Sequence, residues 1–272
     1  MPRDTEGNGS LPNLLGEQDF KVALATQAFY LLYQPRLDLK TRSLSGVEVL
    51  IRWHHPLRGV LLPKTFIPLA EQTGFILPIG AWVLQTALAQ HKRWQAEGYR
   101  INLAINISNK QLEAPDFVAQ LASMLAEHGL EAASLDLDLH ETAFTKTHEP
   151  LPPVIQDLKQ LGVRLCIDNF GLEHLSFEDL KGLPIHSLKI DQSFVGALPE
   201  ATDMVSRVQA MIQLGHQLET KVITKGIESK AQFNALESYG CDEIQGFYYS
   251  RPLSASSFPE MFKRLQHFSV AP

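Results

Sequence analysis

Cysteines and long apolar runs are scarce in this sequence. Of its 272 residues only Cys166 and Cys241 are cysteines, and both stand in apolar surroundings. Two such residues give no disulfide framework and suit a reducing cytosol. No apolar run approaches the roughly 18 residues that cross a bilayer, and the amino terminus has no signal-peptide pattern. The sequence therefore predicts a cytoplasmic domain without direct membrane insertion.

Positive charge is also in short supply. The 24 Lys and Arg residues stand against 30 Asp and Glu, so the formal net charge is −6 and no basic face is left for a nucleic acid polymer. A chain of this length with 44% hydrophobic residues can bury one large core. Residues 1–16 are expected to be a flexible tail or linker remnant, and residues 17–268 a single domain.

What the sequence does contain is a regular alternation of strand and helix patterns. Amphipathic helices are predicted over 81–97, 110–128 and 202–218, with Thr202 and Asp203 as caps of the third, and 258–268 as a last apolar helix. The predicted strands cover 29–37, 46–53, 101–107, 134–139, 163–169, 187–191, 221–224 and 243–249. Eight strands with intervening helices favour an α/β fold of the (β/α)8 barrel type. A doubly wound open sheet is the alternative, but the sequence has no glycine-rich phosphate loop to support it.

Polar side chains stand within or at the ends of successive predicted strands. These residues are Glu48, Asn106, Asp138, Asp168, Lys189, Lys225 and Gln245. Because the carboxyl ends of barrel strands meet at one mouth, their oxygens predict a site for a hard cation such as Mg²⁺ or Mn²⁺. Taken alone, Asp168 and Lys189 also fit a buried structural salt bridge, and any single member fits a solvated strand end.

A series of short motifs runs through the same segments. They are Tyr33-Gln34-Pro35, Glu48-Val49-Leu50-Ile51-Arg52-Trp53, Phe66-Ile67-Pro68-Leu69-Ala70-Glu71, Asn106-Ile107-Ser108, Asp138-Leu139-His140-Glu141, Asp168-Asn169-Phe170-Gly171, Lys189-Ile190-Asp191, Lys225-Gly226-Ile227-Glu228, Gln245-Gly246-Phe247 and Arg251-Pro252-Leu253. In this order they resemble the EAL domains, which hydrolyse or bind the bacterial second messenger cyclic di-GMP. The resemblance covers about residues 17–265. It implies a TIM-like barrel whose first strand runs antiparallel to the others.

The resemblance implies a first divalent-cation site for Mg²⁺ or Mn²⁺. The matching residues are Glu48, Asn106, Asp138 and Asp168. Asp138 replaces a glutamate and is one methylene shorter. Active members resemble two-metal phosphodiesterases, in which two cations activate a water that attacks phosphorus in line and opens the ring to linear pGpG. The resemblance also implies catalytic roles for Lys189 and Glu141.

The second cation site departs from the family pattern. Two neighbouring aspartates and a glutamate are expected there, and this chain has Asp168, Asn169 and Lys225. An amide coordinates Mg²⁺ weakly and an ammonium group not at all, so we expect no second cation. The replacements make the site more positive by three charges, against the two of the missing cation. Lys225 is then either a built-in counter-charge that holds Asp168 or a ligand phosphate, or a drifted residue that points to solvent.

The loop after Gly171 departs as well. The family usually continues with Thr-Gly-Tyr-Ser-Ser, whereas this chain has Leu-Glu-His-Leu-Ser over 172–176, which removes a glycine and its easy positive φ. Glu141, which anchors this loop in the family, is kept. His140 replaces a threonine beside it. His140 and His174 can each be interpreted as a general base or metal ligand, but a hydrogen-bonded structural role is favoured for both.

The ligand-binding positions are better kept than the metal positions. The resemblance matches Arg52 to an arginine that grips a phosphate, for which a bidentate guanidinium is suited, although a strand-end salt bridge is the alternative. The Glu228 carboxylate can accept hydrogen bonds from a guanine edge, and Phe247 fits either an apolar wall or the core. The predicted ligand-binding residues are Gln34, Leu50, Arg52, Asn106, Asp191, Glu228, Gln245, Phe247 and Pro252.

Three functions remain open at this point. They are a catalytically silent receptor for cyclic di-GMP, a weakly active phosphodiesterase that produces pGpG, and a protein-interaction module that has lost the ligand. Retention of Arg52 and Glu228 argues against the third. Asn169 and Lys225 argue against the second, because losing one electrostatic stabiliser commonly costs about 10²–10³ in rate. We therefore expect a degenerate EAL domain that binds cyclic di-GMP and acts on a protein partner or further signalling domains, with homodimerisation left open.

Overall fold

A computed structural model describes residues 15–144, 152–172, 175 and 177–266 of the chain. Within these residues the strands form one sheet in the order β1-β9-β8-β7-β6-β5-β4-β2-β3, and an additional β1–β2 pairing closes it into a barrel. The strands are β1 (Phe29–Asp38), β2 (Ser43–His55), β3 (Gly59–Leu61), β4 (Asn102–Ile107), β5 (Leu135–His140), β6 (Arg164–Phe170), β7 (Ser187–Ile190), β8 (Lys221–Lys225) and β9 (Glu243–Gln245). The eight-stranded α/β barrel predicted from the sequence is thereby confirmed, and the doubly wound sheet is wrong.

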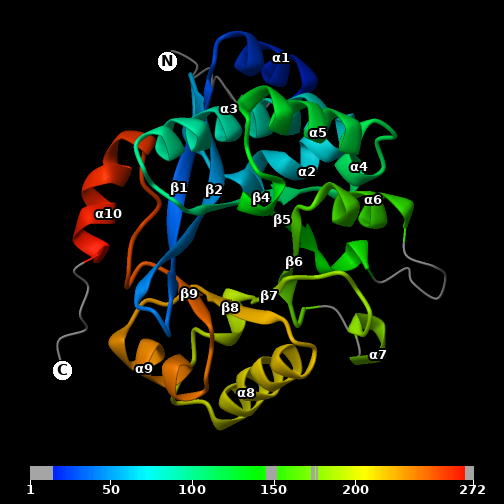
Figure 1. The fold of residues 1–272 in the computed structure, drawn as a ribbon. Coiled ribbons are helices and arrows are strands. Elements are labelled where there is room, and N and C mark those ends of the chain that lie inside the picture. Colours follow the sequence, from blue (N-terminus) through cyan, green and yellow to red (C-terminus); the bar gives the residue numbers. More distant parts are fainter. Residues whose placement is uncertain (1–14, 145–151, 173–174, 176, 267–272) are drawn as a thin grey trace, which may run out of the picture.

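Helices surround the strands (Figure 1). They are α1 (Glu17–Ala25), α2 (Pro63–Thr73), α3 (Ile76–Ala96), α4 (Asn109–Leu112), α5 (Phe117–His128), α6 (Pro153–Leu161), α7 (Phe177–Leu180), α8 (Thr202–Gln217), α9 (Lys230–Ser238) and α10 (Phe258–Gln266). Helix α10 packs on the barrel through the buried Phe258 and Met261. No helix in the described ranges is both long and apolar enough to span a membrane.

The first strand of the barrel runs against its neighbours. Strand β1 pairs antiparallel with β2 and with β9, whereas β2, β4, β5, β6, β7, β8 and β9 follow one another in parallel. The antiparallel first strand expected from the resemblance is therefore confirmed. Because the parallel strands share a direction, all their carboxyl ends meet at one mouth of the barrel.

Alternation along the strands sorts side chains between the barrel interior and the helix-facing core. In β5, Leu135, Leu137 and Leu139 are fully buried in the main hydrophobic cluster. The residues between them, Asp136 and Asp138, are equally inaccessible but bind charged partners from other strands. A strand with a period of two thus delivers apolar groups to one face and ionisable groups to the other. This arrangement brings the polar residues of eight strands together.

Several predicted boundaries are wrong for identifiable reasons. The helix predicted over 110–128 is two helices, because Pro115 cannot donate an amide hydrogen bond and disfavours a helical residue before it. Helix α8 has Ala201 at its N-cap without a side-chain cap, so Thr202 and Asp203 do not cap it. The strand predicted over 243–249 ends at Gln245, where the backbone turns at Gly246, against Ile227. Most of the predicted tail 1–16, and His174, lie outside the described residues.

Candidate functional site at the barrel mouth

The predicted first-site metal residues and Lys189 meet inside the barrel towards its carboxyl-terminal mouth, whereas Glu141 lies in the turn after β5. Glu48 accepts two hydrogen bonds from side-chain amides: Asn106 Nδ2 donates to Oε1 at 2.8 Å and Gln245 Nε2 to Oε2 at 2.5 Å. Gln245 Nε2 also donates to Oε1 of Gln34 at 3.0 Å. The Glu48 carboxylate is almost inaccessible to solvent. The amides therefore supply its hydrogen bonds and hold it in one orientation.

Lys189 is the buried cation at the centre of this group. Its side chain is inaccessible, and its ammonium donates to Oδ2 of Asp138 and lies 3.9 Å from Oε2 of Glu48. Burial and the carboxylates of Glu48 and Asp168 raise the pKa of Asp138 to about 6, although Lys189 opposes the shift. Burial also disfavours ionised Glu48, but Lys189 and Lys225 outweigh it and lower the pKa of that carboxyl to about 2. Glu48 is therefore ionised at neutral pH.

Lys225 ends β8 and binds the two side chains that lie at the end of β6. Its Nζ donates to Oδ1 of Asp168 at 2.5 Å and to Oδ1 of Asn169 at 2.8 Å. Only 16% of the Lys225 side chain is exposed, so the interpretation that it points to solvent is wrong. Burial would lower the pKa of Lys225, but the charges of Asp168 and Glu48 overcome that effect and raise it. The raised pKa keeps Lys225 protonated at neutral pH.

The backbone at Asn169 places its amide towards Lys225. Asn169 has a left-handed conformation with φ of 56°, which asparagine tolerates better than most residues. Asp168 precedes it and Gly171, also at positive φ, follows two residues later. Lys189 does not contact Asp168, so the buried Asp168–Lys189 salt bridge considered from the sequence is wrong. Asp168 has Lys225 as its partner instead.

Two cavities open at the mouth and share Leu50 and Asn169 in their walls. The smaller cavity, of about 310 Å³, gathers residues from five strands and from loops that follow strands. Eight of the nine predicted ligand-binding residues line it: Gln34, Leu50, Arg52, Asp191, Glu228, Gln245, Phe247 and Pro252. The ninth, Asn106, lines the larger cavity of about 670 Å³, together with Asp138 and Asp168.

Polar and aromatic groups are set around the smaller cavity with defined contacts. Arg52 is half-buried, and its Nη1 donates to its neighbour's carbonyl, Ile51 O, at 2.8 Å. No carboxylate in the described residues forms an ion pair with it, so the strand-end salt bridge is wrong. Phe247 is 47% exposed, which excludes the core role, and the Arg251 guanidinium lies 4.5 Å from its ring centroid. Stacking by Arg251 holds the ring while one face remains available.

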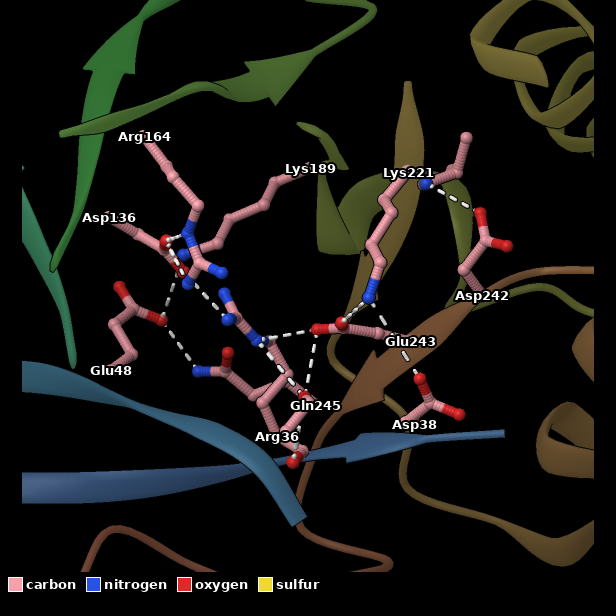
Figure 2. Close-up of polar contacts among 12 residues, drawn as sticks. Arg36, Asp38, Glu48, Asp136, Arg164, Lys189, Lys221, Asp242, Glu243 and Gln245 are labelled. Carbon is pink, nitrogen blue, oxygen red and sulfur yellow. Dashed lines mark hydrogen bonds and ion pairs between the residues drawn. The ribbon is translucent and has the colours of Figure 1, made fainter. Parts of the chain in front are cut away.

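A second charged group, the closing network, lies at the amino-terminal ends of the parallel strands, and Figure 2 shows its contacts. Arg36 is 3% exposed, and it contacts Oδ2 of Asp136 and Oε2 of Glu243, both at 2.7 Å. Asp136 also binds Arg164 at 2.5 Å, and Glu243 binds Lys221 at 3.0 Å. Sequence reasoning missed this network. The signal that could have revealed it is the spacing of two between Asp136 and Asp138, and between Glu243 and Gln245.

Comparison with known proteins identifies the fold and the site together. The family model described as EAL domain matches residues 17–252. These include every residue of the mouth and of the closing network. This chain belongs to the EAL domain family. The sequence resemblance is therefore confirmed at the level of the family.

Two relatives of this EAL domain are a signaling protein and a cyclic di-GMP phosphodiesterase. It is 35% identical over 254 residues to the signaling protein YkoW of Bacillus subtilis, covering 93% of this chain and 32% of that protein. It is 33% identical over 238 residues to the cyclic di-GMP phosphodiesterase PA2567 of Pseudomonas aeruginosa, covering 88% of this chain and 40% of that protein. The chain thus spans two fifths or less of these relatives.

Solved structures of other EAL domains align with it over most of their length. The complex of the PaMucR phosphodiesterase with c-di-GMP has a TM-score of 0.85 at 35% identity and covers 89% of this chain and 98% of that one. The FimX EAL domain from Pseudomonas aeruginosa bound to c-di-GMP has a TM-score of 0.80 at 26% identity, covering 88% and 97%. Each shares the closed barrel described above.

EAL domains in general depend on Mg²⁺ or Mn²⁺, so the mouth must be tested for cation ligands. In the described residues no group of three or more His, Cys, Asp or Glu side chains is arranged to hold a metal ion. The first-site residue types nevertheless fit one hard cation, since Asp138 Oδ1 is buried without a partner in the described structure and Asn106 keeps a carbonyl oxygen. The second-site residues do not fit, because Lys225 holds the oxygens of Asp168 and Asn169.

The predicted loop anchor, Glu141, is fully buried. Its Oε1 accepts a hydrogen bond from the Leu175 backbone at 3.4 Å. Residues 173, 174 and 176 of that loop lie outside the described ranges. His140 lies beside Glu141 at the end of β5. Its Nδ1 accepts a hydrogen bond from the Thr142 backbone, which bears out the structural interpretation of this residue.

Proposed function

We propose that this EAL domain is a catalytically silent receptor for cyclic di-GMP. The observation that carries the proposal is the position of Lys225, whose ammonium binds Asp168 and Asn169. A second divalent cation there would need carboxylate oxygens and would be repelled by the ammonium. Two-metal phosphodiester hydrolysis uses both ions to clamp the attacking and leaving oxygens. Without the second ion, the domain keeps the ligand and does not open its ring.

The charge of the mouth supports a site that needs few external cations. Glu48, Asp138 and Asp168 contribute three negative charges, and Lys189 and Lys225 two positive charges, so the group carries one net negative charge. With acidic residues at positions 169 and 225, the group would carry four net negative charges. Such an excess demands two divalent ions, whereas one charge is readily balanced by a single Mg²⁺ or Mn²⁺ held by the first-site residues Glu48, Asn106, Asp138 and Asp168.

The ligand side of the mouth supports binding. Arg52 offers a bidentate guanidinium for a phosphodiester oxygen, and Glu228 is an exposed carboxylate for the Watson–Crick edge of guanine. Phe247 presents an aromatic face in the same cavity. A second cavity adjoins the first across Leu50 and Asn169. Two adjoining cavities suit a ligand with two purines and two phosphodiesters.

The output of the receptor is a change in what the domain contacts. The ligand would cover exposed groups at the mouth, including Phe247 and Glu228, and so alter the surface offered to a protein partner or to further domains of a longer signalling protein. Homodimerisation belongs to the same proposal. The free buried thiols of Cys166 and Cys241 agree with a cytoplasmic setting.

Isothermal titration of the purified domain with cyclic di-GMP tests the proposal. It is run with Mg²⁺ and again with a chelator, and the nucleotide recovered afterwards is separated by chromatography. Micromolar or tighter binding with intact nucleotide supports the receptor. Conversion to pGpG identifies a weakly active phosphodiesterase, which the retained Lys189 and first cation site would then serve. Absence of binding leaves the interaction module.

A further inference from the structure

His140 stands at the end of β5 on the strand face that looks into the barrel. Alternation from Asp136 through Asp138 places it on the same face as these two carboxylates, while the leucines between them enter the apolar core. His140 is half-buried and lines the larger cavity with Asn106 and Asp168. Its Cα is the register partner of Asp168 on β6.

Hydrogen bonds fix which ring nitrogen of His140 carries the proton. The backbone N–H of Thr142 donates to Nδ1 at 3.3 Å, and an N–H group can only donate. Nδ1 is therefore unprotonated, and in the neutral ring the proton lies on Nε2. Thr142 Oγ1 also lies 3.0 Å from Nδ1 and accepts a hydrogen bond from Asn109 Nδ2 at 3.0 Å. This chain of contacts holds the ring in place.

A fixed Nε2–H has clear chemical consequences. In this tautomer Nε2 presents no lone pair to a metal ion or to a proton, and Nδ1 is already engaged. What remains is donation of one hydrogen bond. Nε2 has no protein hydrogen-bond partner in the described structure, and His140 lines the larger cavity, so a ligand in that cavity can accept this donor.

We propose that His140 is a ligand-binding residue whose Nε2–H donates to a phosphoryl oxygen of the bound cyclic dinucleotide. The inference rests on the proposed function. A cyclic dinucleotide has two phosphodiesters, and Arg52 in the smaller cavity serves only one of them. His140 lies in the other cavity, across the shared Leu50 and Asn169. An N–H donor in that cavity is placed to recognise an anionic oxygen.

Two substitutions separate the Nε2–H donor from the hydrogen bond that Nδ1 accepts from the Thr142 N–H, here called the cap. His140→Asn places a carbonyl oxygen where Nδ1 lies, so it keeps the contact with the Thr142 N–H and loses the donor at Nε2. His140→Gln reaches the Nε2 position with an amide N–H and loses the cap. Affinity for cyclic di-GMP is measured by titration for the wild type and both variants, and melting curves report folding. We expect His140→Asn to melt like the wild type and bind about ten- to a hundredfold more weakly, because a hydrogen bond to a charged group is lost.

We expect only the His140→Asn variant to lose affinity for cyclic di-GMP. His140→Gln should bind within about threefold of the wild type, and the ³¹P spectrum of the complex should show one of the two phosphorus signals displaced by His140→Asn. Wild-type affinity in the folded His140→Asn variant would overturn the inference and leave the receptor intact. Equal weakening in both variants would also overturn it, since the cap would then be what matters. Absence of binding by the wild type itself would instead refute the receptor.

Discussion

Lys225 Nζ lies 2.5 Å from Oδ1 of Asp168, and the two side chains are 16% and 10% exposed. The pair is thus largely withdrawn from solvent, where removing one partner leaves an uncompensated charge. Unlike a bound metal ion, the Lys225 ammonium group cannot be removed by a chelator or by dilution. The consequence is a mouth whose electrostatics do not depend on the cation concentration at this position.

Asn169→Asp combined with Lys225→Glu should restore part of the metal-dependent hydrolysis. The double substitution removes the ammonium and supplies two carboxylates at the end of β6 and β8, and aspartate tolerates the positive φ of position 169. We expect Mn²⁺- or Mg²⁺-dependent conversion of cyclic di-GMP to pGpG to rise by at least about 10²-fold over the wild type. Chromatography of timed reactions measures the change.

The matched control is Lys225→Met, which removes the ammonium without adding a ligand. It should leave hydrolysis at the wild-type level and should weaken folding by about 1.5–3 kcal/mol, because Asp168 loses its charged partner. If the double variant gains no turnover while its melting temperature rises with Mn²⁺, the altered loop or the shorter Asp138 blocks catalysis instead.

Arg52→Ala should weaken cyclic di-GMP binding by about ten- to a hundredfold, because a charge-assisted bidentate contact with a phosphate is lost. Arg52→Lys should recover only part of the loss, since an ammonium is a point donor. Arg207 is an exposed arginine of α8 that lines neither cavity, so Arg207→Ala serves as the control. Equal affinity of the Arg52→Ala and Arg207→Ala variants in titration would remove Arg52 from the site.

Asp136→Asn should destabilise the barrel by about 3–5 kcal/mol, because Arg36 and Arg164 lose a shared carboxylate and Arg36 is fully buried. Urea unfolding measures the difference. Asp157, exposed on α6, gives the control Asp157→Asn, which should change stability by less than about 0.5 kcal/mol. A loss below about 1 kcal/mol for Asp136→Asn would mean that this network contributes no more than surface ion pairs do.

Acid should destabilise the fold through His91 of α3. Its Nε2–H donates to Ile101 O at 3.0 Å, while Nδ1 is buried without a partner in the described structure. Burial lowers the pKa of His91 although that hydrogen bond opposes the shift. The unfolded chain, with an ordinary histidine pKa of about 6.5, then binds the proton better, so stability is full above that pH and falls as the pH drops below it.

Unfolding free energies of the wild type and the His91→Gln variant between pH 7.5 and 5 check this prediction. The variant keeps a donor for the Ile101 carbonyl and has no titrating ring, so part of the decline should vanish. Replacing the exposed His54 by glutamine provides the comparison. Identical slopes for His91→Gln and the wild type would place the acid sensitivity elsewhere.

The barrel and its mouth could be predicted because both depend on local patterns. Strand alternation and ordered motifs located Glu48, Asp138 and Asp168, and the register of parallel strands then brought these side chains together without further information. No boundaries were predicted for helix α2, because Pro68 interrupts its helical pattern. Burial of its own side chains Phe66 and Ala70 in the core keeps the segment helical.

Contacts between distant segments could not be predicted. The sequence left two orientations open for Lys225, since only the packing of β8 beside the end of β6 turns its ammonium to Asp168 and not to solvent. The tautomer of His140 depends on a backbone N–H two residues later, which no residue pattern reveals. The ion pairs of Arg36 join β1 to β5 and β9, separated by about 100 and 200 residues.

The mouth and the closing network use residues of the same strands but have different roles. Strands β1, β5 and β9 each place one residue in the closing network and another, two positions along, beside the mouth, as in Arg36 and Gln34 or Asp136 and Asp138. Because the ion pairs of the closing network hold these strands together, residues at the mouth can be replaced without loss of the barrel.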